Sequence, residues 1–340
     1  MQIRSYGKKG FVLIFALWVL GLLTFLAVSV ALGVRQKTVM AEKLEEQNRM
    51  AYLQEACLKQ IKSFIRKEME RVQFIYSADL KRLLHNNVSF FGRVPFGEDN
   101  ATVSFSVYEE GRLSEQFGVI DEERKINLNT TNVLVLQRVI EQVLNVKPEE
   151  TLSLAQAILD WRQQGSSRAD GFFSDDYYGN LKHSYFKKDA NYELLEELLL
   201  VKWMTRLKYE KLLPYLTVYG DGKININTAS GVVLYALGLD DVLVEKVLKY
   251  RRGQDGVEAT EDDIFFNKTF DVASDVARVV KLDPQEIRAL DALNLQGLLT
   301  TNSYYFYFTM QSRISRSGWT RNAKVIYSSR DNKVLYWREK

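Results

Sequence analysis

Few residues of this chain belong to the types that usually carry enzyme or metal chemistry. Its 340 residues include one cysteine, Cys57, and two histidines, His85 and His183. One cysteine excludes an intrachain disulfide and a cysteine-rich zinc or iron–sulfur site, and two histidines leave little for a histidine-based metal centre. Any site must therefore be built mainly from carboxylates, amides and backbone groups.

Adjacent carboxylates offer the remaining catalytic chemistry. Asp175 and Asp176 could in principle act as general acid and general base, but no nucleophile or cofactor motif accompanies them. A metal-dependent enzyme is therefore a poor interpretation, and it requires an activity that is lost when both aspartates are replaced.

The composition is that of a globular protein of about two domains. Hydrophobic residues make up 46% of the chain and charged residues 26%, and 46 Lys and Arg against 43 Asp and Glu give a net charge of +3. This balance provides no general attraction to nucleic acid or to anionic surfaces, so partners must be selected by local features.

The N-terminal region contains an apolar segment long enough to span a membrane. Residues 11–34 carry no charge, and as a helix they would span about 36 Å, enough to cross the roughly 30 Å hydrocarbon core of a bilayer. Arg4, Lys8 and Lys9 precede them, which predicts that the short tail stays in the cytoplasm and that the rest of the chain lies on the other side.

The sequence Lys8-Lys9-Gly10-Phe11 at the start of this segment is similar to the cleavage site of a type IV prepilin. A secretory signal peptide has a shorter apolar region, followed by its cleavage site. We therefore expect residues 1–10 to be a basic leader that is removed between Gly10 and Phe11. An unprocessed signal anchor is the alternative.

A long amphipathic helix is expected over residues 35–85. No Pro or Gly occurs from Arg35 to Leu84, and apolar residues recur in steps of mostly three and four. Glu45 with Arg49 and Glu55 with Lys59 are spaced to form i,i+4 pairs on its polar face. The apolar positions are Met50, Leu53, Cys57, Ile61, Phe64, Met69, Val72, Tyr76, Leu80 and Leu83.

The remaining sequence predicts an α+β fold, with this stalk helix packed on an antiparallel sheet as in pilins. Alternating apolar residues place the first strands within residues 86–120 and the last strands within residues 301–340. Residues 121–300 are then a large, mainly helical insertion into that domain.

The insertion contains an internal repeat, at 126–145 and 224–252. Residues 126–131 read Ile-Asn-Leu-Asn-Thr-Thr and residues 224–229 read Ile-Asn-Ile-Asn-Thr-Ala, each ahead of an amphipathic helical pattern. In each copy the second Asn, Asn129 or Asn227, is expected to cap the following helix while the two apolar residues enter the core. Both copies resemble the opening of a helix-hairpin-helix module.

This resemblance raises the alternative of a membrane-anchored DNA receptor, whose binding would fall steeply with salt. DNA-binding modules use a Gly-apolar-Gly hairpin to bring backbone amides to phosphate. Here the hairpins are Gly238-Leu239-Asp240-Asp241 and residues 145–148, which contain no Gly pair. We therefore expect the modules to be structural and to bind no nucleic acid.

Over nearly its whole length the chain resembles the K-type minor pseudopilins of type II secretion. The resemblance implies a protein that joins other minor pseudopilins and the major pseudopilin, caps the tip of a periplasmic fibre, and is processed and methylated after cleavage by a prepilin peptidase. It also implies a single-pass inner-membrane protein with a periplasmic C-terminal domain. The motifs concerned are Lys9-Gly10-Phe11, residues 121–131, residues 157–161, Gly171, residues 175–178, Glu197-Leu198 and residues 223–229.

Two further expectations follow from the resemblance. Most pilins carry Glu at the fifth position after the cleavage point, but K-type subunits lack it, and Phe15 stands there in this chain. Family members also bind calcium in the insertion, and oxygen ligands suit that ion. Gln163 and Gln164 replace acidic residues of the family and remove part of that site. The candidate ligands here are Asp160, Asp170, Asp175, Asp176 and Asp189.

Overall fold

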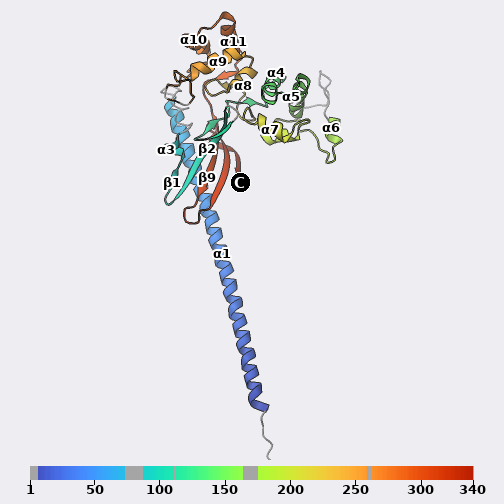
Figure 1. The fold of residues 1–340 in the computed structure, drawn as a ribbon, viewed down its shortest axis with the longest axis vertical. Coiled ribbons are helices and arrows are strands. Elements are labelled where there is room, and N and C mark those ends of the chain that lie inside the picture. The colour runs from blue at the N-terminus through green and yellow to red at the C-terminus, as the bar shows by residue number, and fades with distance from the viewer. Residues whose placement is uncertain are drawn as a thin grey trace, which may run out of the picture.

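The computed structural model describes residues 7–72, 87–109, 112–163, 175–258, 260 and 262–339. Its longest element is helix α1 (Gly7–Val72), which projects from the head as a rod (Figure 1). With 66 residues this helix is about 99 Å long. The predicted apolar segment and the predicted stalk are therefore one continuous helix, and residues 73–85 of the stalk prediction lie outside the described residues. The helix is long and apolar enough to cross a membrane.

A seven-stranded antiparallel sheet packs against the upper part of this rod. Its main path is β1-β2-β9-β10-β11, with β3 paired to β2 and β4 paired to β9. The register Val103↔Met310 shows that early and late strands lie side by side, as predicted. The short helix α3 (Val88–Phe91), which precedes β1, was not predicted. The strands are β1 (Val94–Phe96), β2 (Asp99–Glu109), β3 (Arg112–Phe117), β4 (Ile120–Asp121), β9 (Tyr305–Arg313), β10 (Thr320–Ser328) and β11 (Lys333–Glu339).

The apolar stripe of α1 forms one side of the core beneath the sheet. Cys57 and Ile61 are fully buried against side chains such as Val103, Phe308 and Val325. Burial raises the pKa of the Cys57 thiol to about 12, so this residue is a small hydrophobic side chain rather than a reactive thiol.

One of the two predicted helical ion pairs is wrong. Glu55 and Lys59 do pair, at 2.9 Å, but Arg49 does not pair with Glu45. Its Nε lies 2.6 Å from a carboxylate oxygen of Asp99 at the start of β2. Because Asp99 is nearly buried, it offers Arg49 a better partner than an exposed glutamate, and the bond ties the rod to the sheet.

The insertion folds as two helical modules. The first module, residues 126–218, contains β5 (Ile126–Asn127), α4 (Val133–Leu144), α5 (Pro148–Arg162), α6 (Asp175–Gly179), η1 (Leu195–Leu200), α7 (Arg206–Leu212) and β6 (Leu216–Thr217). The second module, residues 224–301, contains β7 (Ile224–Asn225), α8 (Gly231–Ala236), α9 (Asp241–Arg251), η2 (Thr269–Asp271), α10 (Val272–Val279), α11 (Pro284–Leu295) and β8 (Leu299–Thr300).

Each module is closed by a pair of very short strands. β5 pairs with β6, and β7 pairs with β8, in both cases in parallel. These four strands were not predicted, because a two-residue strand is too short to show alternation in a sequence.

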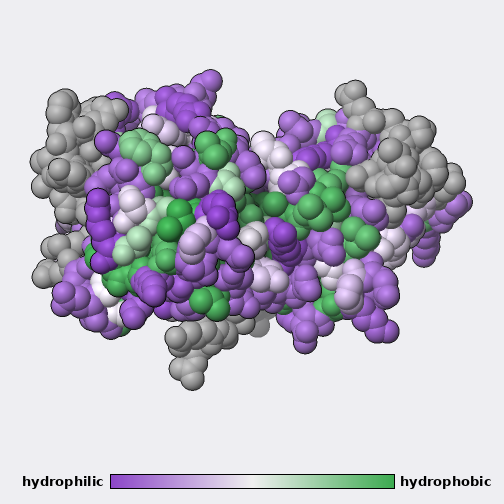
Figure 2. Space-filling view, turned by 90° about the horizontal axis from the view of Figure 1, so that it is seen from above, coloured by the Kyte–Doolittle hydropathy of each residue, from purple (hydrophilic) through white to green (hydrophobic). Residues whose placement is uncertain are grey.

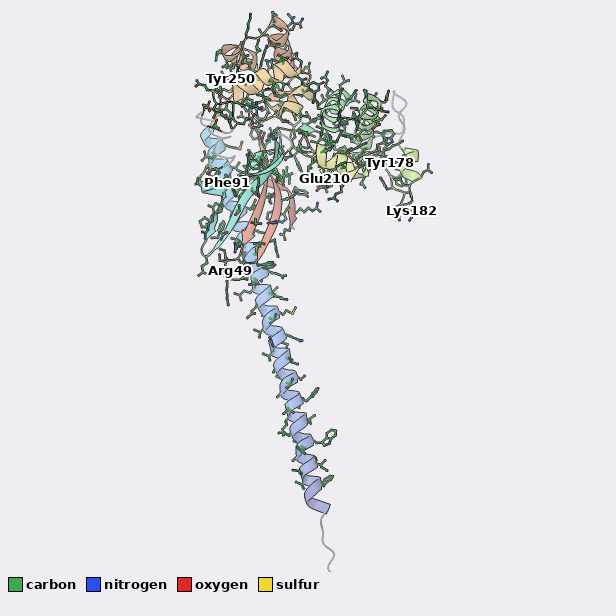
Figure 3. The ribbon with its side chains drawn as sticks, viewed as in Figure 1. Arg49, Phe91, Tyr178, Lys182, Glu210 and Tyr250 are labelled. Carbon is green, nitrogen blue, oxygen red and sulfur yellow. The ribbon has the colours of Figure 1, made fainter. Side chains whose placement is uncertain are left out.

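The two modules lie beside each other at the end of the sheet that is farthest from the free end of the rod (Figure 1). Their buried side chains form one continuous hydrophobic core, in which Leu136 of α4 and Leu234 of α8 take part. The first module reaches far to one side of the rod, as the positions of Tyr178 and Lys182 in Figure 3 show.

Candidate functional site

Two of the five predicted calcium ligands lie together. Asp160 is buried near the end of α5, and Asp189 stands in the following loop. Between them lies the ammonium group of Lys187, whose Nζ is 3.5 Å from Oδ1 of Asp160 and 3.2 Å from Oδ1 of Asp189. The side chains of Lys187 and Asp160 are each only 3% exposed.

The other three candidate ligands cannot be compared with this pair. Asp170 lies outside the described residues, and Asp175 and Asp176 begin α6 but their side chains are not described. Within the described residues, no group of three or more His, Cys, Asp and Glu side chains is arranged to hold a metal ion. Calcium binding by this chain stays a prediction.

The motif residues of the first module form a cluster of aromatic and charged side chains. The rings of Trp161 and Tyr178 meet edge to face, 5.5 Å apart. The Trp161 indole N–H and the Lys188 ammonium both donate to the carboxylate of Glu197, at 3.4 and 2.8 Å. The backbone N–H of Leu194 donates to it as well. Although partial burial opposes ionisation, these bonds lower the pKa of Glu197, which therefore holds the loop against α5 as a carboxylate.

The two repeats are equivalent in structure as well as in sequence. The side-chain amide of Asn129 binds the N–H and C=O of Tyr192, at 2.7 and 2.9 Å. Asn227 binds the same two groups of Phe266, at 2.8 and 2.9 Å. Each asparagine also donates to a carbonyl just after the last strand of its module, that of Val218 or of Thr301.

The expectation that Asn129 and Asn227 cap helices is therefore wrong. The caps are Asn132 and Ser230, whose side chains accept from the N–H groups of Val135 and Val233. The chain first makes a turn after each motif, so each helix begins later and the second asparagine is free to bind the distant loop. The apolar motif residues are buried as predicted, namely Ile126, Leu128, Ile224 and Ile226.

An arginine at the end of the second helix completes each module. The Arg162 guanidinium donates to the carbonyls of Leu128 and Thr131. Arg251 donates to the carbonyl of Ala229, which corresponds to Thr131 in the repeat, and pairs with Glu258 at 2.8 Å. Each arginine thus binds backbone carbonyls of the repeat motif in its own module.

The two hairpins end their first helices differently, and in the second module a carboxylate caps the next helix. Asn145 ends α4 with a φ of +49°. In the second module the Asp240 carboxylate accepts from the N–H of Leu243, at 2.8 Å, and caps α9. A negative charge therefore already occupies this helix N-terminus, where phosphate would bind in a nucleic-acid-binding module.

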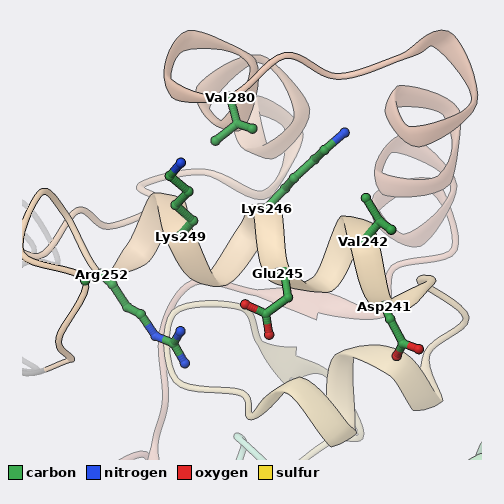
Figure 4. Close-up of a pocket in the computed structure, with 8 residues that line it drawn as sticks. Asp241, Val242, Glu245, Lys246, Lys249, Arg252 and Val280 are labelled. Carbon is green, nitrogen blue, oxygen red and sulfur yellow. The ribbon is translucent and has the colours of Figure 1, made fainter.

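A groove runs along α9, and its walls carry charges of both signs (Figure 4). Lys246 and Lys249 point toward the side of Val280, and Glu245 points away from it. Lys246 is bound to Glu286 at the start of α11. This groove is not a uniformly basic surface, which argues against the DNA-receptor alternative.

A run of three carboxylates at residues 121–123 joins the sheet to both modules, and sequence reasoning missed it. One Asp121 oxygen accepts from the hydroxyls of Ser303 and Thr228, at 2.6 and 2.8 Å, and from the amide of Asn225, at 3.3 Å. Glu122 accepts from the Thr217 hydroxyl at 2.6 Å. Asp121 therefore holds the second module and Glu122 holds the end of the first.

The third member of this junction, Glu123, binds the returning chain. Its carboxylate accepts from the N–H of Tyr304 at 2.5 Å, and its carbonyl accepts from the N–H of Asn225 at 2.8 Å. Burial raises the pKa of Glu123 to about 7, and the nearby charge of Asp121 adds to the shift.

The predicted processing site lies within α1, near the free end of the rod. The side chain of Phe11 is exposed, as are the other large apolar side chains of residues 11–34. Phe15 is also exposed, on the same bare part of the helix. Neither the cleavage between Gly10 and Phe11 nor the methylation that would follow is tested by this arrangement.

Comparison with known proteins supports the resemblance. Residues 119–221, which include β4 and the whole first module, match the family described as "Type II secretion system (T2SS), protein K". A search of curated proteins finds no match.

The fold is also that of a solved relative. The chain is similar to a chain in the crystal structure of the GspK-GspI-GspJ complex from the type 2 secretion system of enterotoxigenic Escherichia coli. The TM-score is 0.50 at 16% identity, and the match covers 73% of this chain and 82% of that one. The rod, the antiparallel sheet and the insertion all agree with the expected α+β architecture. By the family match of residues 119–221 and by its fold, this chain is similar to the K-type minor pseudopilins of the type II secretion system.

Proposed function

We propose that this chain is a minor pseudopilin, that it is the terminal subunit of the type II secretion pseudopilus, and that its head stops further growth at the tip. The observation that carries the proposal is the position of the two modules. Both lie beyond the sheet, opposite the free end of the rod, and one extends well to the side (Figure 1). Viewed from above, the head is broad in one direction and carries hydrophobic patches on both halves (Figure 2). A subunit added above would need the space that these modules fill.

The rod supplies the driving force for assembly. Its upper apolar stripe is used by the chain's own sheet, through residues such as Met50 and Ile61. The large apolar side chains of residues 11–34 are exposed in the monomer. Moving them into lipid or against neighbouring rods stabilises the assembled state by about 25 cal/mol per Å² of buried apolar surface.

We place the rod in the inner membrane as a single span, with the head in the periplasm. The basic residues Arg4, Lys8 and Lys9 support a cytoplasmic N-terminal tail. A prepilin peptidase then removes residues 1–10, and the new N-terminus at Phe11 is methylated. Phe15 supports a terminal position, because a last subunit has no neighbour above it whose N-terminal amine requires a carboxylate.

The partners proposed are other minor pseudopilins, and below them the major pseudopilin. The relative of similar fold was crystallised in a complex with GspI and GspJ. The fold match, which covers 73% of this chain, supports assembly with partners of that kind, and we propose that the rods pack side by side. The sheet and rod are the parts that pseudopilins have in common, whereas the modules enlarge only the head.

Labelling of isolated fibres tests the tip position. Pseudopili are assembled with this chain carrying an epitope after residue 339 and are labelled with gold-conjugated antibody. We expect gold at one end of each fibre and none along its length. The same epitope on the major pseudopilin is the control and labels the whole fibre. Gold distributed along fibres that contain the tagged chain would overturn the proposal.

A further inference from the structure

We propose that the ammonium group of Lys187 takes the place of a calcium ion in the first module. It lies between Asp160 and Asp189, where an ion bound to both carboxylates would have to lie. The proposal is independent of the tip position. It concerns how the long connection between α5 and η1 is attached, and it assigns to the chain's own ammonium group a contact that a metal ion would otherwise make.

The ammonium group of Lys187 lies where an ion bound to both aspartates would have to lie. The Lys187 Nζ lies within 3.5 Å of a carboxylate oxygen of both aspartates, and its side chain is 3% exposed. Calcium requires six to eight oxygen ligands at 2.3–2.6 Å. An ion that contacted both Asp160 and Asp189 would have to enter beside a buried positive charge.

The buried charges of Asp160 and Lys187 stabilise each other. Asp160 is as deeply buried as Lys187, and a buried carboxylate or ammonium without an opposite charge is strongly unfavourable. The Asp189 side chain is partly exposed, so solvent can share its charge through the other oxygen, whereas the Oδ1 that faces Lys187 is buried. The ammonium group therefore serves mainly to compensate Asp160 and to bring the loop to it.

Backbone and side-chain bonds fix the segment around Lys187. The N–H of Asp189 donates to the carbonyl of Trp161 at 3.1 Å, and Trp161 is the residue that follows Asp160. Asp189 adopts a φ of +53°, which turns the chain at this point and is accessible to Asp. Lys188 pairs with Glu197. The residues that follow Lys187 thus hold it in place through contacts of the chain itself.

Hydrogen exchange of the full-length chain in detergent micelles tests the proposal. Exchange is followed in peptides from residues 177–190, once in a calcium chelator and once in millimolar calcium. We expect the same protection in both conditions. Lys187→Met should accelerate exchange in this segment by about tenfold or more, because the buried Asp160 carboxylate loses the positive charge of Lys187. Lys182→Met, a change of an exposed lysine in the same segment, is the matched control and should have no effect.

Three results would decide the matter. If calcium slows exchange in the unmodified chain and Asp160→Asn removes that effect, calcium binds Asp160 and the proposal is overturned. If the segment exchanges at the same rate in Lys187→Met as in the unmodified chain, the ammonium group does not attach the loop to Asp160, and the proposal is also overturned. If calcium slows exchange equally in Asp160→Asn, the ion lies on other carboxylates and the assignment of Lys187 stands.

Peptides from the second module report whether each variant folds. If Lys187→Met disrupts them too, Lys187→Arg replaces it. This variant keeps the positive charge. Its segment should be as well protected from hydrogen exchange as that of the unmodified chain, and calcium should not change that protection. Loss of protection in Lys187→Arg that calcium restores would count against the proposal.

Discussion

A carboxylate oxygen of Asp121 lies 2.6 Å from the hydroxyl of Ser303, although 182 residues separate them. Asp121 ends β4, where the chain leaves the sheet, and Ser303 stands just before β9, where the chain returns. This bond closes the insertion at its base. Both modules are thus carried by a fixed junction rather than by two independent linkers.

Replacing Ser303 should loosen this junction. Ser303→Ala removes one donor to a buried carboxylate, and hydrogen bonds to charged groups contribute about 2 kcal/mol each. We expect the free energy of unfolding of the head, measured by urea titration, to fall by about that amount. Ser329→Ala, which removes a bond to the carbonyl of Tyr304, should cost about 1 kcal/mol or less. Equal effects of the two changes would contradict a special role for Asp121.

The equivalence of the two asparagines predicts local effects. Asn129→Ala removes bonds to Tyr192 and Val218, and Asn227→Ala removes the corresponding bonds in the second module. Each change should cost about 3 kcal/mol, because several buried backbone groups lose their partner. Hydrogen exchange should rise first in the module that carries the change. Asn132→Ala, which removes only a helix cap, should cost about 1 kcal/mol.

Contact of the first module with the segment that joins the two modules predicts the effect of a methyl group at Gly222. This residue has a φ of +90°, and a Cβ there would overlap the side chain of Thr130 in the first module. We expect Gly222→Ala to lower the free energy of unfolding by about 3 kcal/mol. Gly97→Ala is the control, because Gly97 also has a positive φ but faces open space. It should cost only the backbone strain, about 1 kcal/mol.

The raised pKa of Glu123 predicts that the head is less stable at higher pH. With a pKa of about 7 against an ordinary value of 4.5, the folded chain keeps a proton that the unfolded chain releases. This contribution is fully present below the ordinary pKa and is lost as the pH rises through about 7. Unfolding measured from about pH 5 to about pH 8 should show a loss of up to about 3 kcal/mol from this group. Glu123→Gln should flatten that part of the profile, and an unchanged profile in the variant would refute the assignment.

Periodic features of the sequence were sufficient to predict the frame of the molecule. The three- and four-residue spacing from Met50 to Ile61 predicted the stalk, and alternation around Val103 and Phe308 predicted the sheet. The repeated asparagine motif predicted two related modules, because the same short segment must be folded in the same way at both places.

The contacts that fix the site could not be predicted in this way. Asn129 binds Tyr192, and Lys187 binds Asp160, across distances in sequence at which periodicity carries no information. Motif chemistry even suggested the wrong partner, since an asparagine before a helix usually caps it. Arg162, which directly precedes Gln163 and Gln164, binds the first motif through contacts that no sequence spacing indicates.

Export by the host bacterium tests the central claim most directly. Exported proteins are measured in the medium and in the periplasm of cells that lack this chain. The assignment as a minor pseudopilin predicts that they accumulate in the periplasm and that the full-length chain restores their release. Normal release in the absence of the chain would contradict the account.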